Sequence, residues 1–229
     1  MQTDWALSQL VVTGDDATTF LQGQLTCDVT AIGDGELAAG AWCTPKGRVI
    51  VVFRIRKRDD GFILFTPTQL ADGIEKRLTM FRFRSKVDIR LRPAGPADLG
   101  LDSDLPFKQW LATDLEHGIA WIDDALTEQF TPHMLSLDLA GAVSFDKGCY
   151  TGQEVVARTH YKGSSRRRLK RFGGAEGALP GTRVQLDDRN VGTVINVVDD
   201  MCLAVVPVDD ADAGLRIDGK PLSLLPLPY

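Results

Sequence analysis

The densest group of side chains able to carry out chemistry lies in the segment 146–158. It combines an ammonium, a thiol, a carboxamide, a carboxylate and a guanidinium, which belong to Lys147, Cys149, Gln153, Glu154 and Arg158. A buried strand would leave many of these groups without partners, and burying an unpaired polar group costs free energy. We therefore predict that this segment is a loop that forms a site.

Two glycines, Gly148 and Gly152, interrupt the segment on either side of Cys149. Glycine adopts backbone angles that other residues avoid, so it occurs where a chain turns sharply or lies close to a ligand. A purely structural turn is the alternative. A helix starting after Gly152 would place Glu154 and Arg158 one turn apart on the same face, where they either contact a ligand or pair with each other.

Cys149 is the candidate reactive thiol, with Lys147 as its catalytic partner, because a nearby cation favours the thiolate. The alternative is a small buried residue that only packs. Tyr150 either stacks on a ligand ring or fills the core.

Composition limits the classes of function. The chain has 229 residues with 44% hydrophobic and 25% charged residues, which suffices for one large or two modest globular domains. The net charge is −5 and the pI is about 5.2, which argues against a protein that holds nucleic acid by bulk charge.

The spacing of cysteines and histidines predicts no metal site. Cys27, Cys43 and Cys202 are far apart in the sequence and form no close pairs with Cys149, as reduced thiols of a cytosolic protein do. His133 and His160 are interpreted as hydrogen-bonded structural residues.

No stretch reaches the roughly 18 apolar residues of a membrane span. Residues 1–5 lack the basic flank and apolar run of a signal peptide. We expect a soluble, cytoplasmic protein with no membrane partner.

Hydrophobic periodicity and turn residues predict an α+β fold with helices on an antiparallel sheet. Helices are predicted to begin near Ala17, at Thr66 and at Ser103 or Asp104. Strands are predicted at 6–12, 36–44, 48–56, 62–65, 86–92 and 119–122, with 48–56 and 62–65 as a hairpin.

Two local details are predicted as well. Thr66, Pro67 and Gln69 have the spacing of an N-cap, a first helical residue and a capping-box partner. Gly23 falls inside the first predicted helix, where the close approach of another backbone would explain it.

The pattern of residue types changes after Arg158. A linker at 162–165 precedes a basic run at 166–171, and we place a domain boundary near residue 165, between domains 1–165 and 166–229. Short strands at even spacing predict a small C-terminal β-barrel; they lie at 184–186, 191–198, 203–206, 215–217 and 222–225.

The run from Lys147 to Glu154, followed by Arg158, resembles the signature of the YgfZ family. These are folate-binding relatives of the glycine-cleavage T protein and include a mitochondrial iron–sulfur assembly factor. The similarity extends over residues 6–171 and includes the segments 20–29, 45–48, 84–87 and 130–133.

The resemblance implies a T-protein-like layered domain around a central folate pocket, with a break near 93–100 and the barrel as its C-terminal domain. The implied ligand is tetrahydrofolate or a one-carbon derivative. The implied role is support of iron–sulfur cluster assembly or repair, with transient partners such as a tRNA methylthiolation enzyme. The candidate folate-binding residues are Arg48, Gly148, Tyr150, Gly152, Gln153, Glu154 and Arg158.

The folate chemistry fits these residue types. A carboxylate such as Glu154 can accept two N–H bonds from the amino–amide edge of a pterin, a strong and orienting contact. Arg48 and Lys147 either supply positive charge for the glutamate tail of folate or are simply solvated.

Two departures from the family pattern stand out. Ser136 occupies a position where the family usually has asparagine, so an amide contact is weakened or replaced by a hydroxyl. The chain is also shorter than many relatives, and we expect the compression between residues 93 and 130, within the second subdomain.

Two other functions compete with folate binding alone. A folate-dependent aminomethyltransferase of the T-protein type would need an acidic pair where Ile50 and Val51 stand, and neither residue can move a proton. An RNA-binding module built on 166–171 would lack an aromatic stacking platform. Whether any chemical step is catalysed stays open.

Overall fold

A computed structural model describes residues 6–163 and 165–229. The segment 1–5, considered above for a leader, and Ser164 of the predicted linker lie outside the described residues. Among the described residues, no helix has the length and apolar character needed to cross a membrane.

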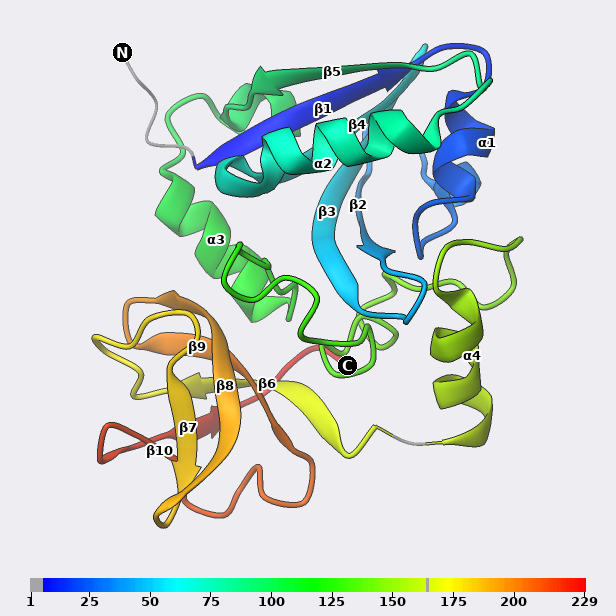
Figure 1. Cartoon of the computed structure of the whole chain (residues 1–229). Helices are drawn as coiled ribbons and strands as arrows, with labels where there is room; N and C mark the ends of the chain where they lie inside the picture. The colour runs from blue at the N-terminus through cyan, green and yellow to red at the C-terminus, as the bar shows by residue number, and fades with distance from the viewer. Residues whose placement is uncertain (1–5, 164) are drawn as a thin grey trace.

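The N-terminal part is built on a five-stranded antiparallel sheet with the order β2-β3-β4-β1-β5 (Figure 1). Its strands are β1 (Leu7–Thr13), β2 (Leu37–Cys43), β3 (Val49–Arg58), β4 (Gly61–Pro67) and β5 (Asp88–Pro93). The register pairs Arg54 with Phe65 and Arg58 with Gly61, which confirms the predicted hairpin.

Alternation along the strands gives the sheet two buried faces. Phe62 and Leu64 of β4 pack beneath α1 (Ala17–Gln22) and α2 (Thr68–Phe81). Ile63 and Phe65 point to the opposite face, where α3 (Phe107–Glu116) contributes Trp110. Because successive side chains of a strand point to opposite faces, this all-apolar run is explained by helical cover on both sides.

Two local predictions are corrected. Helix α2 begins at Thr68, not at Thr66, because β4 continues through Pro67 and Thr66 pairs with Ser8 of β1. Strand pairing here overrides the capping signal. Gly23 is the C-terminal cap of α1, not an interior residue, and a Cβ on it would meet only carbonyls of its own helix at 3.5 Å or more.

The region between β5 and residue 152 holds little regular structure. It contains the 3₁₀ turn η2 (Pro96–Leu99) and α3, and the strand predicted at 119–122 is wrong. The side chain of Asn196 accepts a hydrogen bond from the Trp121 N–H and donates one to the Trp121 carbonyl, both at 2.8 Å. The Asn196 side chain thus satisfies the two backbone groups of Trp121 that a neighbouring strand would otherwise pair with.

The C-terminal part is a seven-stranded antiparallel sheet with the order β11-β10-β7-β8-β9-β6-β12. Its strands are β6 (Arg167–Gly173), β7 (Arg183–Leu186), β8 (Arg189–Val198), β9 (Met201–Pro207), β10 (Arg216–Ile217), β11 (Lys220–Pro221) and β12 (Ser223–Leu225). Since β11 pairs at one edge with β10 and β12, two residues on, pairs at the other edge with β6, the sheet curls into a nearly closed barrel. The predicted barrel is confirmed.

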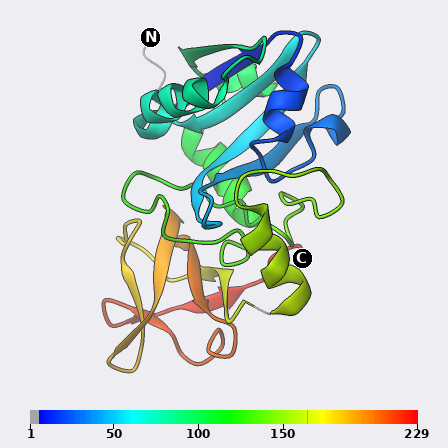
Figure 2. The same ribbon diagram turned by 45° about the vertical axis from the view of Figure 1, so that its right-hand side comes forward.

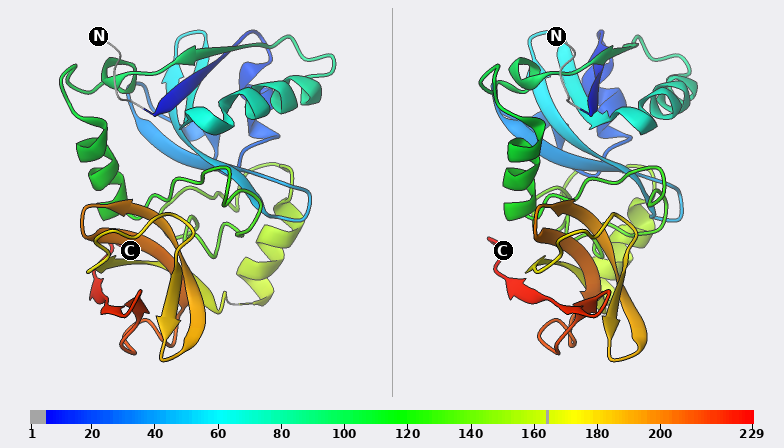
Figure 3. Two further views of the ribbon diagram at one scale, coloured as in Figure 1. Left: turned by 60° about the vertical axis from the view of Figure 1, so that its left-hand side comes forward. Right: turned by 90° about the vertical axis from the view of Figure 1, so that its left-hand side faces the viewer.

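The barrel and helix α4 (Gln153–Lys162) lie on the same side of the N-terminal sheet, with the irregular turns of residues 119–152 between them (Figures 2 and 3). One cluster of buried residues joins all these parts. It includes Val52 of β3, Leu137 of the turns, Val156 of α4, and Leu169 and Val205 of the barrel. The barrel is therefore packed into a core that it shares with the N-terminal sheet.

Candidate functional site

Gly152 is fixed by the turn between β2 and β3. Its φ is +85°, and a Cβ built on it would lie 2.5 Å from the Thr44 carbonyl oxygen and 3.2 Å from the Gly47 Cα. Gly47 is equally tight, since a Cβ there would come within 2.9 Å of Val155. Both its conformation and its surroundings thus require glycine at 152, and packing accounts for it without a ligand.

Gly148 differs from Gly152 in both respects. Its φ is not in the left-handed region, and a Cβ there would meet nothing within 4 Å. It lies beside Cys149, and both residues are exposed. No contact among the described residues requires glycine at 148, and its contact with a ligand stays a prediction.

Helix α4 begins at Gln153, directly after Gly152. Glu154 and Arg158 are both exposed on it, and no ion pair joins them among the described residues. The Gln153 side chain accepts a hydrogen bond of 3.3 Å from the Tyr150 N–H, so its carboxamide closes the turn before the helix. The two charged side chains therefore remain available to a ligand.

Lys147 is directed toward the N-terminal segment. Its ammonium donates hydrogen bonds to the carbonyl oxygens of Leu25 (2.8 Å) and Cys27 (2.7 Å). Burial lowers the pKa of Lys147 to about 8, against the opposing influence of Cys27 and Asp28. The ammonium thus anchors the loop, and its catalytic partnership with Cys149 stays a prediction.

Tyr150 is buried, with its ring centroid 5.3 Å from the Lys147 ammonium. Its hydroxyl has no hydrogen-bond partner within the described part of the chain. Burial raises the pKa of this hydroxyl, and nearby Cys43 raises it further. Because an unpaired buried hydroxyl is costly, its position fits a polar atom of a bound ligand.

The four thiols separate into two classes. Cys149 is exposed, whereas Cys27, Cys43 and Cys202 are buried. Burial raises the pKa of Cys27 to about 11 and those of Cys43 and Cys202 to about 12. Only Cys149 is therefore placed to react with molecules in solution.

The remaining predicted positions lie near the lower end of β3. Arg48 is exposed and donates a hydrogen bond of 2.7 Å to the Gln129 carbonyl. Ile50 and Val51 are both buried in the strand, so no proton donor stands at these positions. Ser136 has φ +53°, a conformation that asparagine also tolerates, and its hydroxyl accepts a hydrogen bond of 3.2 Å from the Leu169 N–H. The hydroxyl thus binds the barrel backbone.

Two features escape sequence reasoning. The carbonyl groups that hold Lys147 lie more than a hundred positions away in the chain. The His133 side chain is almost completely buried, and its ring nitrogens have no hydrogen-bond partner within the described residues, whereas a hydrogen-bonded histidine is expected from the sequence. Both features depend on contacts between segments that are distant in the sequence.

Comparison with known proteins identifies relatives over the whole chain. Residues 166–227 match the model of the CAF17 C-terminal β-barrel domain. A tRNA-modifying protein YgfZ from Enterobacter sp. (strain 638) is 29% identical over 299 residues, which cover 99% of this chain and 91% of that protein. The YgfZ protein of Aliivibrio fischeri (strain MJ11) is 28% identical, with 99% and 90% coverage. The chain is similar to the YgfZ proteins over nearly its whole length. The resemblance read from residues 147–158 is thereby confirmed.

The fold of this chain is also found in a protein of the glycine cleavage system. The aminomethyltransferase T from Bartonella henselae matches with a TM-score of 0.71, covering 97% of this chain and 84% of that protein, at 15% identity. The predicted T-protein-like fold is confirmed; identity this low shows the fold alone.

The comparison also bears on the length of the chain. The alignment with the Enterobacter YgfZ protein extends over 299 positions, whereas this chain has 229 residues. At least 70 positions of the alignment are therefore gaps in this chain. Between β5 and β6 the described residues form helices and turns but no strand.

Proposed function

We propose that this protein is a cytosolic tetrahydrofolate-binding accessory protein. It supports iron–sulfur cluster assembly or repair and thereby iron–sulfur-dependent tRNA modification. The observation that carries the proposal is the exposed side of the segment 146–158. There, Gly148, Cys149, Glu154 and Arg158 are all exposed and have no partner that the fold requires.

These residues suit a reduced folate. The Glu154 carboxylate can accept the two N–H groups of the pterin edge, and it lies in the first turn of α4, where the helix dipole stabilises negative charge. Arg158, one turn further, offers a fork of donors to a carboxylate of the glutamate tail. Tetrahydrofolate, or a one-carbon derivative of it, would supply the one-carbon chemistry when bound.

The tRNA and iron–sulfur part of the proposal rests on the relatives. The curated relatives carry the name tRNA-modifying protein. The exposed thiol of Cys149 beside the folate-binding residues provides a reactive group that a client enzyme can reach. Contact with clients such as a tRNA methylthiolation enzyme would be transient.

Aminomethyl transfer is the second candidate, because aminomethyltransferase T has the same fold. That reaction needs a group that handles the amine proton of the substrate. The buried apolar side chains of Ile50 and Val51 provide none. Direct RNA binding by the basic run is disfavoured because that run forms β6 inside the barrel, where Arg168 already pairs with Asp138.

Titration with tetrahydrofolate tests the binding proposal. Glu154→Ala should raise the dissociation constant at least about tenfold, because a charge-assisted hydrogen bond contributes roughly 1.5–3 kcal/mol. Glu116→Ala is the matched control, since Glu116 is an exposed glutamate at the end of α3. Equal affinities of the two variants for tetrahydrofolate would show that Glu154 does not contribute to binding.

A cellular measurement tests the role of the thiol. Cys149→Ser and wild type would be expressed in a bacterium that lacks its own YgfZ protein, and methylthiolated tRNA nucleosides would be measured by mass spectrometry. We expect wild type to restore the modification and Cys149→Ser to fail at equal protein level. Full restoration of the modification by Cys149→Ser would show that the thiol has no role in it.

A further inference from the structure

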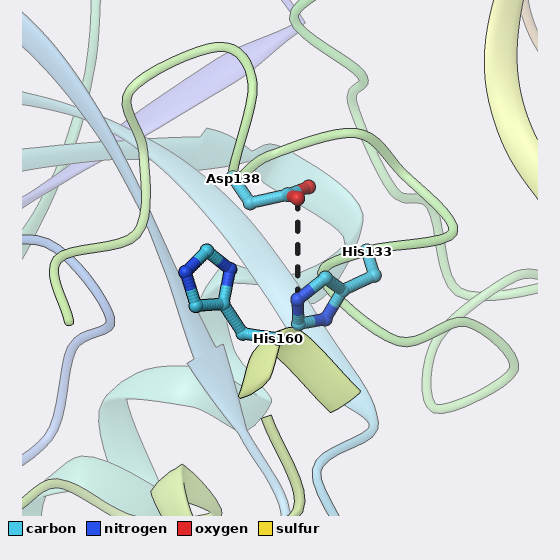
Figure 4. Close-up of side chains that lie close together, drawn as sticks. All are labelled: His133, Asp138 and His160. Carbon is cyan, nitrogen blue, oxygen red and sulfur yellow. Dashed lines mark ion pairs between the residues drawn. The ribbon is translucent and has the colours of Figure 1, made fainter. Parts of the chain in front are cut away.

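Three side chains from two separate segments of the chain meet between α4 and the barrel. His133 and Asp138 come from the turns that precede the segment 146–158, and His160 comes from the last turn of α4 (Figure 4). One potential ligand atom from each lies within 4.8 Å of the others. Two imidazoles and one carboxylate form the donor set of many open zinc sites.

His133 is the reason to regard this group as a site. Its side chain is only 2% exposed, and neither ring nitrogen has a hydrogen-bond partner within the described residues. The nearest charged atom is Oδ2 of Asp138, at 3.9 Å from Nε2, which is too far for a hydrogen bond. A buried imidazole left in this way costs roughly 1–3 kcal/mol. Coordination of an ion would satisfy it.

The protonation of His133 suits a ligand. Burial lowers its pKa, and the charges of Arg168 and His160 lower it too, while Asp138 acts in the opposite direction. Only the neutral imidazole binds a metal ion, and a lowered pKa favours that form.

Asp138 is held in the manner of a metal-binding carboxylate. Its side chain is 7% exposed, and its Oδ1 accepts a hydrogen bond from Arg168 while Oδ2 faces His133. Arg168 also donates to the His133 carbonyl at 3.1 Å, which orients both residues from strand β6. Such outer partners fix the direction of a ligand. The positive charge of Arg168 reduces the attraction for a cation, so we expect weaker binding than at a closed structural zinc site.

His160 is the exposed member of the group. It is exposed and stacks on Phe145 with ring centroids 3.7 Å apart. Zinc–ligand bonds of about 2.0–2.1 Å place tetrahedral ligands roughly 3.4 Å from one another. The present separation must therefore shrink on binding, and an exposed side chain at the end of a helix can make that movement.

We propose that His133, Asp138 and His160 bind a divalent transition-metal ion of the Zn²⁺ class, with water in the remaining positions. The ion would connect α4, which carries Glu154 and Arg158, to the turns that Arg168 attaches to the barrel. The proposal stands on this cluster alone and does not depend on folate binding.

Metal titration of the untagged full-length chain, stripped with a chelator, tests the proposal. Cobalt(II) serves as the spectroscopic probe and zinc as the competitor, in a Cys149→Ser background that removes the exposed thiol as a ligand. We expect one equivalent of Co²⁺ with visible d–d absorption bands, and displacement of the ion by Zn²⁺.

Two histidine variants decide the assignment. His160→Ala should weaken binding at least about tenfold, since even outer-shell changes cost ten- to a hundredfold. His117→Ala is the matched control, because His117 is exposed and lies outside the cluster. Asp138→Asn should weaken binding as well. Equal affinities of His160→Ala and His117→Ala, or an absence of saturable binding to the parent chain, would overturn the proposal.

Discussion

The two sides of the segment 146–158 differ in what holds them. On the buried side, Lys147, Tyr150 and Gly152 contact the N-terminal sheet and its turns through hydrogen bonds, burial and close packing. On the exposed side, Cys149 and Glu154 have no partner that the fold requires. The presence of chemical groups in a signature thus does not by itself show which of them act, because some are needed to build the loop.

This difference predicts two classes of variant. Changes on the buried side should lower the free energy of unfolding. Changes on the exposed side should leave stability nearly intact and alter ligand binding or reactivity.

The largest effect on stability is expected at Gly152. Gly152→Ala forces a left-handed alanine and places its Cβ against the Thr44 carbonyl, so the free energy of unfolding should fall by about 2–4 kcal/mol. Gly148→Ala is the matched control and should change it by less than about 0.5 kcal/mol. Urea denaturation of both variants measures the difference. Similar losses in both would contradict the division into two sides.

A smaller effect is expected at Lys147. Lys147→Met leaves the Leu25 and Cys27 carbonyls without their donor, so stability should fall by about 1–2 kcal/mol at pH 7.

The effect of Lys147→Met should also depend on pH. Burial lowers the native pKa of Lys147 from 10.5 to about 8, so between these values the unfolded chain binds more protons than the native chain. The free energy of unfolding of wild type, relative to the variant, should therefore increase as pH rises from 8 toward 10. Denaturation at pH 7 and pH 9.5 measures this, and a constant or decreasing difference would show that Lys147 is not held as described.

Much of the sheet is predictable from local pattern, since the strands at 48–56 and 62–65 follow from apolar runs and an Asp-Gly turn. The errors occur where distant partners override local signals. Thr66 has the features of a helix cap but pairs with Ser8 across the sheet. Residues 119–122 have the features of a strand, but Trp121 bonds to the Asn196 side chain and the Ile119 N–H donates to the Asp114 carbonyl.

The same limit applies to the site. The position of Glu154 on a helix follows from Gly152, because a glycine in the left-handed conformation precedes the first turn. The partners of Lys147 do not follow from its neighbours, because its ammonium crosses to carbonyls near the start of the chain. The cluster of His133, Asp138 and His160 could not be predicted from the sequence either, because these residues do not have the spacing of a metal-binding motif.

Alkylation of Cys149 is the most direct test of folate binding against the exposed side of the loop. Iodoacetamide should modify one thiol of the native protein, identified by mass spectrometry as Cys149, because the other three are buried. A saturating reduced folate, such as 5-formyltetrahydrofolate, should slow this reaction in wild type but not in Glu154→Ala. An unchanged rate in wild type at saturating folate would contradict a ligand lying on this side of the loop.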